Sequence, residues 1–141
     1  MTTETKETFR WPPLESNPEV FTDYMRGVGL TAEWAINELY GFDEDLLGML
    51  PQPVMAVIAN VERLAKADDR QRGDAALVKP GLFYMKQHEA LDNACGVIAC
   101  LHAVYNTAAG ATLPAESILA RHLATASALD PAARAAALEA N

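Results

Sequence analysis

The chain has 141 residues, a length that suits one domain, and its hydrophobic fraction of 50% is enough for a real core. Nineteen acidic and eleven basic residues give a net charge of −8, which argues against a general nucleic-acid binder, because such proteins present a basic face. The sequence has no apolar signal region at its start and no run approaching the roughly 18 apolar residues of a membrane span, so we expect a soluble, cytoplasmic protein.

The N-terminal part predicts a polar tail, an extended segment and a helix. Residues 1–8 are polar and are expected to be flexible, whereas the prolines within residues 9–15 favour an extended chain. A helix is predicted from Pro18, because Asn17 is a good N-cap residue and proline is favoured at the first helical position. Gly27 is expected to end this helix.

The middle of the chain predicts a short helix, a strand and a loop. Residues 43–51 read as a short helix that stops before a proline. Val54–Ala59 is a nearly all-apolar run between prolines and predicts a buried strand, which either ends there or continues into a helical segment at residues 61–66. Residues 67–80 are charged, lack an apolar period and predict a loop.

The C-terminal part predicts two more helices after a small-residue turn at residues 107–114. Residues 115–123 form an amphipathic pattern, and Asp130 with its following proline is a cap for a last helix at residues 132–140. Together with the single expected strand, these patterns predict an α+β fold that is mostly helical in this chain.

One buried helix is predicted to begin at a cysteine. From Cys95 onward, apolar residues recur at the three- and four-residue spacing of a helix, and Asp92 and Asn93 are good N-cap residues before it. The first turn of a helix favours negative charge, so a thiolate at Cys95 would be stabilised, and the Gln87 amide upstream could stabilise an oxyanion. Cys100 lies five positions further along the helix, so a disulfide between the two cysteines is not expected.

A nucleophile is not the only interpretation, because buried cysteines are commonly inert. However, YMKQ at residues 84–87, NACG at 93–96 and LHAVYN at 101–106 together resemble the active-site segment of the short ubiquitin carboxy-terminal hydrolases. RWPPLESNPEV at residues 10–20 is similar to the start of that family's domain. The resemblance implies a papain-like α-β-α domain with a central antiparallel sheet. It also implies a thiol-dependent deubiquitinase that needs no cofactor or metal.

By position, the resemblance implies that Cys95 is the nucleophile and Gln87 the oxyanion donor, and that ubiquitin or a ubiquitin-like protein is the partner. Seven residues, 88–94, separate the two, whereas the family usually has five. The family's general-base histidine and its orienting aspartate lie in later motifs that do not occur in this chain. We therefore expect residues 1–141 to be a partial catalytic domain, with most of the sheet supplied by absent residues.

The three histidines of the chain are poor substitutes for the missing base. His102 follows Cys95 by seven residues, which places it about 10 Å away along a helix and suggests a structural role. His88 adjoins Gln87 but is not used in the family pattern, and His122 belongs to a surface-type amphipathic helix.

Three interpretations follow for the whole chain. It is the amino-terminal half of a deubiquitinase whose histidine and aspartate come from a second polypeptide or from unlisted residues. Alternatively, it is a truncated, inactive relative that binds ubiquitin or another partner, or a helical interaction module that shares only ancestry with the family. The first is the one the motifs favour.

Overall fold

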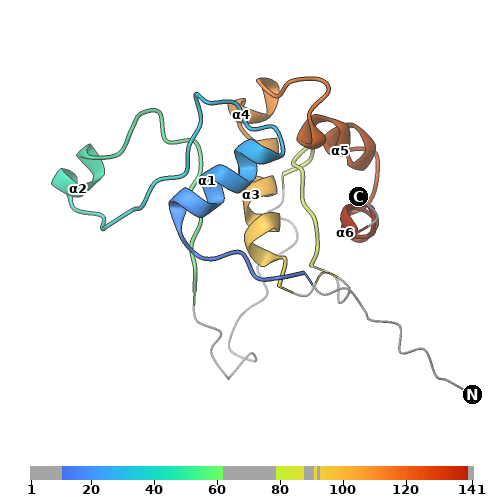
Figure 1. Ribbon diagram of the computed structural model, residues 1–141, viewed down its shortest axis with the longest axis horizontal. Coiled ribbons are helices and arrows are strands. Elements are labelled where there is room, and N and C mark those ends of the chain that lie inside the picture. Colours follow the sequence, from blue (N-terminus) through green and yellow to red (C-terminus); the bar gives the residue numbers. More distant parts are fainter. Residues whose placement is uncertain (1–10, 62–78, 88–90, 92, 140–141) are drawn as a thin grey trace, which may run out of the picture.

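Six helices joined by irregular segments make up the described part of the computed structural model, which comprises residues 11–61, 79–87, 91 and 93–139 (Figure 1). The helices are α1 (Pro18–Gly27), α2 (Glu44–Gly48), α3 (Cys95–Tyr105), α4 (Ala108–Ala111), α5 (Ile118–Ala126) and α6 (Pro131–Glu139). In Figure 1, α3 lies between α1 on one side and α5 and α6 on the other. None of the described helices is long and apolar enough to cross a membrane.

The central position of α3 follows from its composition. Val97, Ile98, Cys100, Leu101 and Val104 are buried along one side of the helix, and every other residue of α3 except Cys95 is at least partly buried. Apart from His102, these residues are apolar or weakly polar, so α3 is apolar and covered on most sides. A helix that is apolar on nearly all sides must be covered on nearly all sides. The covering core residues come from every neighbouring element: Met25, Leu30, Phe83, Met85, Leu91, Ala109, Leu119, Ala126 and Ala135.

Capping side chains set the starts of the three longer surface helices. The Asn17 carboxamide oxygen accepts the Glu19 N–H at 2.9 Å, and Asp130 Oδ1 accepts the Ala132 and Ala133 N–H groups. These caps confirm the helices predicted at Pro18 and after Asp130. The amphipathic helix is also confirmed, but it begins at Ile118, because Ser117 Oγ accepts an N–H of the first turn and is its cap.

Two shorter elements differ in extent from the prediction. The helix expected within residues 43–51 is confirmed as α2, although Asp43 makes no side-chain capping bond. Residues 107–114, expected to be a turn, contain the single helical turn of α4.

The prediction of a buried strand at Val54–Ala59 is wrong. The described residues contain no strand, and this segment is an irregular chain in which every residue from 51 to 61 is exposed, with Val57 at 67%. A strand exists only when a neighbour pairs with its backbone, and no described segment does so here. The expected helical continuation at 61–66, the loop and the flexible tail at 1–8 lie mostly or wholly outside the described residues.

A close contact joins the end of α1 to the start of α5. The Leu119 N–H donates to the Val28 carbonyl at 3.0 Å. Gly29 has a φ of 123°, a backbone conformation that residues with a side chain rarely adopt. A Cβ on Gly29 would lie 2.3 Å from the Ser117 Cβ. Only glycine fits this position.

We therefore expect Gly29→Ala to lower the free energy of unfolding by about 2 kcal/mol or more, through backbone strain and the clash with Ser117. Gly27 is the matched control, because a Cβ there meets no atom within 4 Å. Gly27→Ala should be neutral or stabilise the chain by up to about 1 kcal/mol. Urea unfolding of both variants measures this, and equal losses would contradict the tight α1–α5 junction.

Candidate active site

Cys95 is the first residue of α3, and its side chain is exposed. The same helix buries Cys100, and burial raises the pKa of the Cys100 thiol to about 11. The backbone N–H groups at the start of α3 give that end of the helix a partial positive charge, which stabilises an anion placed there. Of the two cysteines, Cys95 is therefore the one with the exposure and the position of a nucleophile.

The cap expected at Asn93 is not formed. Ala94 occupies the N-cap position and has no side-chain group to bond with, whereas Asp92 lies outside the described residues. Asn93 instead has a φ of 64°, a left-handed conformation that asparagine tolerates, and its amide donates to the Trp11 carbonyl at 3.2 Å. Asn93 therefore ties the turn before Cys95 to the N-terminal segment.

The first turn of α3 is also held against α1. A Cβ on Gly96 would lie 3.0 Å from a ring carbon of Phe21, so the absence of a side chain lets the two elements approach this closely. Cys95 thus extends from a turn whose backbone is fixed on one side by Asn93 and on the other by Phe21.

Gln87 lies at the end of an extended segment that runs alongside α3 in the opposite direction. Phe83 exchanges two hydrogen bonds with Asn106: the Phe83 N–H donates to Oδ1 at 2.7 Å, and Nδ2 donates to the Phe83 carbonyl at 2.8 Å. Two residues later, the Met85 N–H donates to His102 Nε2 at 3.0 Å. The segment therefore advances from the C-terminal end of α3 toward its N-terminal end, as Figure 1 also shows.

This register places Gln87 along the helix. Two extended residues advance about 6.6 Å and four helical residues about 6 Å, so the steps from Phe83 to Met85 and from Asn106 to His102 match. Continued for two more residues, the same step brings Gln87 level with about residue 98, one turn short of Cys95. The backbone at Gln87 thus lies toward the end of α3 that carries the thiol.

A second set of contacts holds the same segment from α6. Arg134 Nη1 donates to the Tyr84 carbonyl at 2.8 Å, and the Lys86 N–H donates to the Pro131 carbonyl at 3.1 Å. The Arg134 guanidinium also lies 4.5 Å from the centre of the Phe83 ring, a favourable cation–π distance. The residue pattern of the last helix does not predict these contacts of Arg134.

His122 is buried, with 4% of its surface exposed, so the expectation that it lies on the surface is wrong. The Tyr105 hydroxyl donates to the Leu119 carbonyl at 3.0 Å and accepts from His122 Nδ1 at 3.0 Å. Burial lowers the pKa of His122 and raises that of Tyr105. The ring therefore stays neutral inside the core, and its Nε2 has no hydrogen-bond partner among the described residues.

His102 is structural, as expected. Burial lowers its pKa, and its Nε2 needs a free lone pair to accept the Met85 N–H, so the neutral ring is the form that fits. With His88 outside the described residues, neither of the two described histidines is free to act as a base toward Cys95. No group of three or more metal-ligating side chains occurs in the described segments either.

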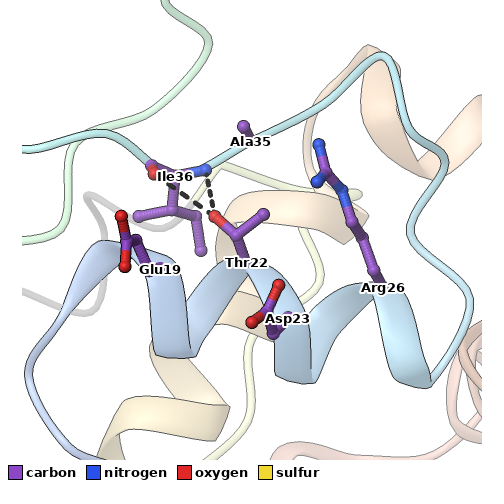
Figure 2. A pocket seen from close by; sticks show the side chains of 6 residues that line it. All are labelled: Glu19, Thr22, Asp23, Arg26, Ala35 and Ile36. Atoms are coloured by element: carbon purple, nitrogen blue, oxygen red, sulfur yellow. Dashed lines mark hydrogen bonds between the residues drawn. The ribbon is translucent and has the colours of Figure 1, made fainter.

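An open hollow beside α1 is lined by side chains that hold the neighbouring backbone (Figure 2). Its lining includes Thr22, whose hydroxyl accepts the Ile36 N–H at 2.9 Å and donates to the Ile36 carbonyl at 3.2 Å. Arg26, also in the lining, donates to the carbonyls of Ala32 and Trp34. These side chains hold the extended segment after α1, and the lining contains no cysteine or histidine.

The geometry can be compared with known proteins. The family model for ubiquitin carboxyl-terminal hydrolase, family 1, matches residues 11–141. The chain belongs to this family. The resemblance inferred from the residues around Gln87 and Cys95 is therefore confirmed.

Relatives with this name occur in several organisms. Ubiquitin carboxyl-terminal hydrolase 3 of Arabidopsis thaliana is 35% identical, over 96% of this chain and 60% of its own length. The ubiquitin carboxyl-terminal hydrolase of Drosophila melanogaster is 36% identical over 68% of this chain and 44% of its own length. Ubiquitin carboxyl-terminal hydrolase YUH1 of Saccharomyces cerevisiae is 35% identical over 67% of this chain and 39% of its own length. The chain thus spans 60% or less of the length of these relatives.

Sequence reasoning missed Asn106 as a functional candidate. One signal was available: Asn106 follows His102 by four residues, which puts both side chains on one face of α3. That spacing indicates a shared partner but does not say that the partner is the backbone before Gln87.

The buried histidines predict acid sensitivity. A histidine whose pKa is lowered by folding stabilises the protein fully above its unfolded pKa of about 6.5, and this stability is lost as pH falls below that value. The free energy of unfolding should therefore drop between pH 7 and pH 5. The variant His122→Leu lacks one titrating group. The change of its unfolding free energy with pH should therefore be smaller by up to about 1.4 kcal/mol per pH unit. Urea unfolding across this pH range tests it, and an unchanged slope would show that His122 does not titrate on unfolding.

Proposed function

We propose that this chain is the amino-terminal part of a thiol-dependent deubiquitinase. Its substrates would be esters, thioesters and amides at the carboxy-terminal glycine of ubiquitin or a ubiquitin-like protein, with Cys95 as nucleophile. The observation that carries the proposal is the exposed thiol at the first residue of α3, toward which the segment bearing Gln87 runs. The net charge of −8 is also compatible with the basic carboxy-terminal region of ubiquitin.

The chemistry proceeds in two steps. The Cys95 thiolate attacks the glycine carbonyl carbon, the carbonyl π electrons move to oxygen, and the Gln87 amide donates a hydrogen bond to that oxyanion. Collapse of this intermediate expels the leaving amine, alcohol or thiol, which takes a proton, and leaves a thioester. Water then adds to the thioester and releases the ubiquitin carboxylate and the thiolate. Both steps need a general base and acid.

A second polypeptide, or further chain, would supply the histidine and aspartate. Three observations support this part of the proposal. Both described histidines are engaged in the core, and the chain spans 60% or less of the length of these relatives. Val54–Ala59 exposes its apolar side chains, and the described residues place no strand beside it. Added strands would complete the papain-like sheet on this segment and bring the imidazole to Cys95.

Labelling with a ubiquitin that carries an alkylating group at its carboxy terminus tests the nucleophile. We expect slow, stoichiometric modification of the chain, and Cys95→Ala should abolish it. Cys100→Ala is the matched control and should label normally, because the Cys100 thiol is buried and has a raised pKa. Modification that persists in Cys95→Ala would remove Cys95 from the proposal.

Turnover of an amide or ester of ubiquitin tests the missing base. The isolated chain should hydrolyse neither at a useful rate, and adding a polypeptide that contains the family histidine and aspartate should restore Cys95-dependent hydrolysis. Gln87→Ala should lower the restored rate by about 10²-fold or more. Robust hydrolysis by the isolated chain would instead point to His88 as the base. If the chain binds ubiquitin but shows neither labelling nor restored turnover, the interpretation as an inactive relative is favoured. If it does not bind ubiquitin, the interpretation as a helical interaction module is favoured.

A further inference from the structure

We infer that His102, Asn106 and Arg134 are positioning residues that hold the backbone before Gln87, so that its amide reaches the oxyanion formed at Cys95. We call these three side chains the backbone clamp. The inference rests on the proposed function, since it concerns the geometry of the same thiol and amide.

The clamp replaces the neighbours that a strand would have. An extended segment ordinarily satisfies its N–H and C=O groups through a sheet. Here Asn106 bonds both backbone groups of Phe83, Arg134 bonds the Tyr84 carbonyl, and His102 bonds the Met85 N–H. Side chains thus fix three consecutive residues before Gln87.

Two residues of the clamp, Asn106 and Arg134, also make hydrogen bonds outside the segment. Asn106 Nδ2 also donates to the His102 carbonyl at 2.9 Å, which links two members at the end of α3. Arg134 uses its remaining N–H groups on the carbonyls of Ala126 and Ser127, both at 3.0 Å. Asn106 and Arg134 are therefore also held by hydrogen bonds outside the segment. The His102 ring instead stacks on Tyr84 and bonds the Met85 N–H, so it packs directly against the segment that it holds.

The clamp positions the backbone before Gln87 and does not contact the substrate. Phe83 and Met85 are buried, with 7% and 1% of their surfaces exposed. Gln87 is exposed and follows the last hydrogen-bonded group of the segment, the Lys86 N–H. A segment released from α3 would leave the Gln87 amide free to point elsewhere. An oxyanion donor must be held in place before the reaction, because its contribution comes from preorganisation.

Binding of a ubiquitin whose carboxy terminus is an aldehyde measures this positioning. The Cys95 thiol adds across the aldehyde: a C–S bond forms, the C=O π bond breaks, and the thiol proton moves to the former carbonyl oxygen, which becomes a hydroxyl. The resulting hemithioacetal places an oxygen where the oxyanion would be. We expect Gln87→Ala to weaken this binding by about tenfold or more, and Asn106→Ala and His102→Leu to weaken it by up to the same factor.

The decisive readout is non-additivity. If the clamp acts through Gln87, then Asn106→Ala combined with Gln87→Ala should bind the aldehyde no more weakly than Gln87→Ala alone. His102→Gln, whose amide oxygen can accept the Met85 N–H, should restore most of the binding lost in His102→Leu. A variant destabilised elsewhere, Gly29→Ala, should bind the aldehyde normally below its unfolding temperature. Independent, additive losses or failure of His102→Gln to restore binding would mean a structural role and overturn the inference.

Alkylation of the same variants separates the two proposals. The alkylating ubiquitin forms no oxyanion, so Asn106→Ala and His102→Leu should still label at Cys95, which also shows that they are folded. Normal labelling with undiminished aldehyde binding would overturn the clamp alone. Failure of the unmodified chain to label at all would overturn the proposed function, and the clamp with it.

Discussion

The pairing of Asn106 with Phe83 is the constraint on which the rest of this structure depends. The central helix α3 is apolar on most sides, so extended segments must cover it, yet the described residues provide no sheet for their backbones. The Asn106 amide solves this for Phe83 by accepting its N–H and donating to its carbonyl. The Thr22 hydroxyl solves it in the same way for Ile36 on the other side of the helix. Buried backbone groups must be satisfied, and here helix side chains do it.

This solution explains why the two ends of α3 differ in chemistry. At the C-terminal end, polar side chains such as Asn106 and His102 are committed to the backbone and cannot react. At the N-terminal end, the approach of Gly96 to Phe21 and the bond from Asn93 to Trp11 fix the turn without using the thiol. The helix N–H groups there remain oriented toward an added negative charge. Rigid support and an exposed nucleophile thus come from opposite ends of one helix.

How much of this could be predicted depended on the range of the interactions involved. Helix starts at Asn17 and Asp130 were predictable, since each cap bonds within three residues. The position of Cys95 at the start of a helix was predictable from the apolar spacing of the residues that follow it, and the motifs around it pointed to the family. The cap at Asn93 was wrong because Ala94 occupies the N-cap position and Asn93 has a left-handed φ of 64°. Its Nδ2 donates instead to the carbonyl of Trp11, 82 residues away. The burial of His122 was equally hidden, because it depends on Tyr105 from another helix.

The segment Val54–Ala59 is apolar but exposed in the described structure. A run as apolar as Val54–Ala59 normally lies inside a protein, yet Val57 is 67% exposed and Ile58 is 38% exposed. Periodicity alone identifies such a run as core but cannot show whether its partner lies in the same polypeptide. Exposed apolar segments of this kind are typical of surfaces that another element covers. Within the part of the chain that the structure describes, this segment has no strand beside it and the Cys95 thiol has no free imidazole near it. Because the relatives are longer than this chain, one added element could supply both.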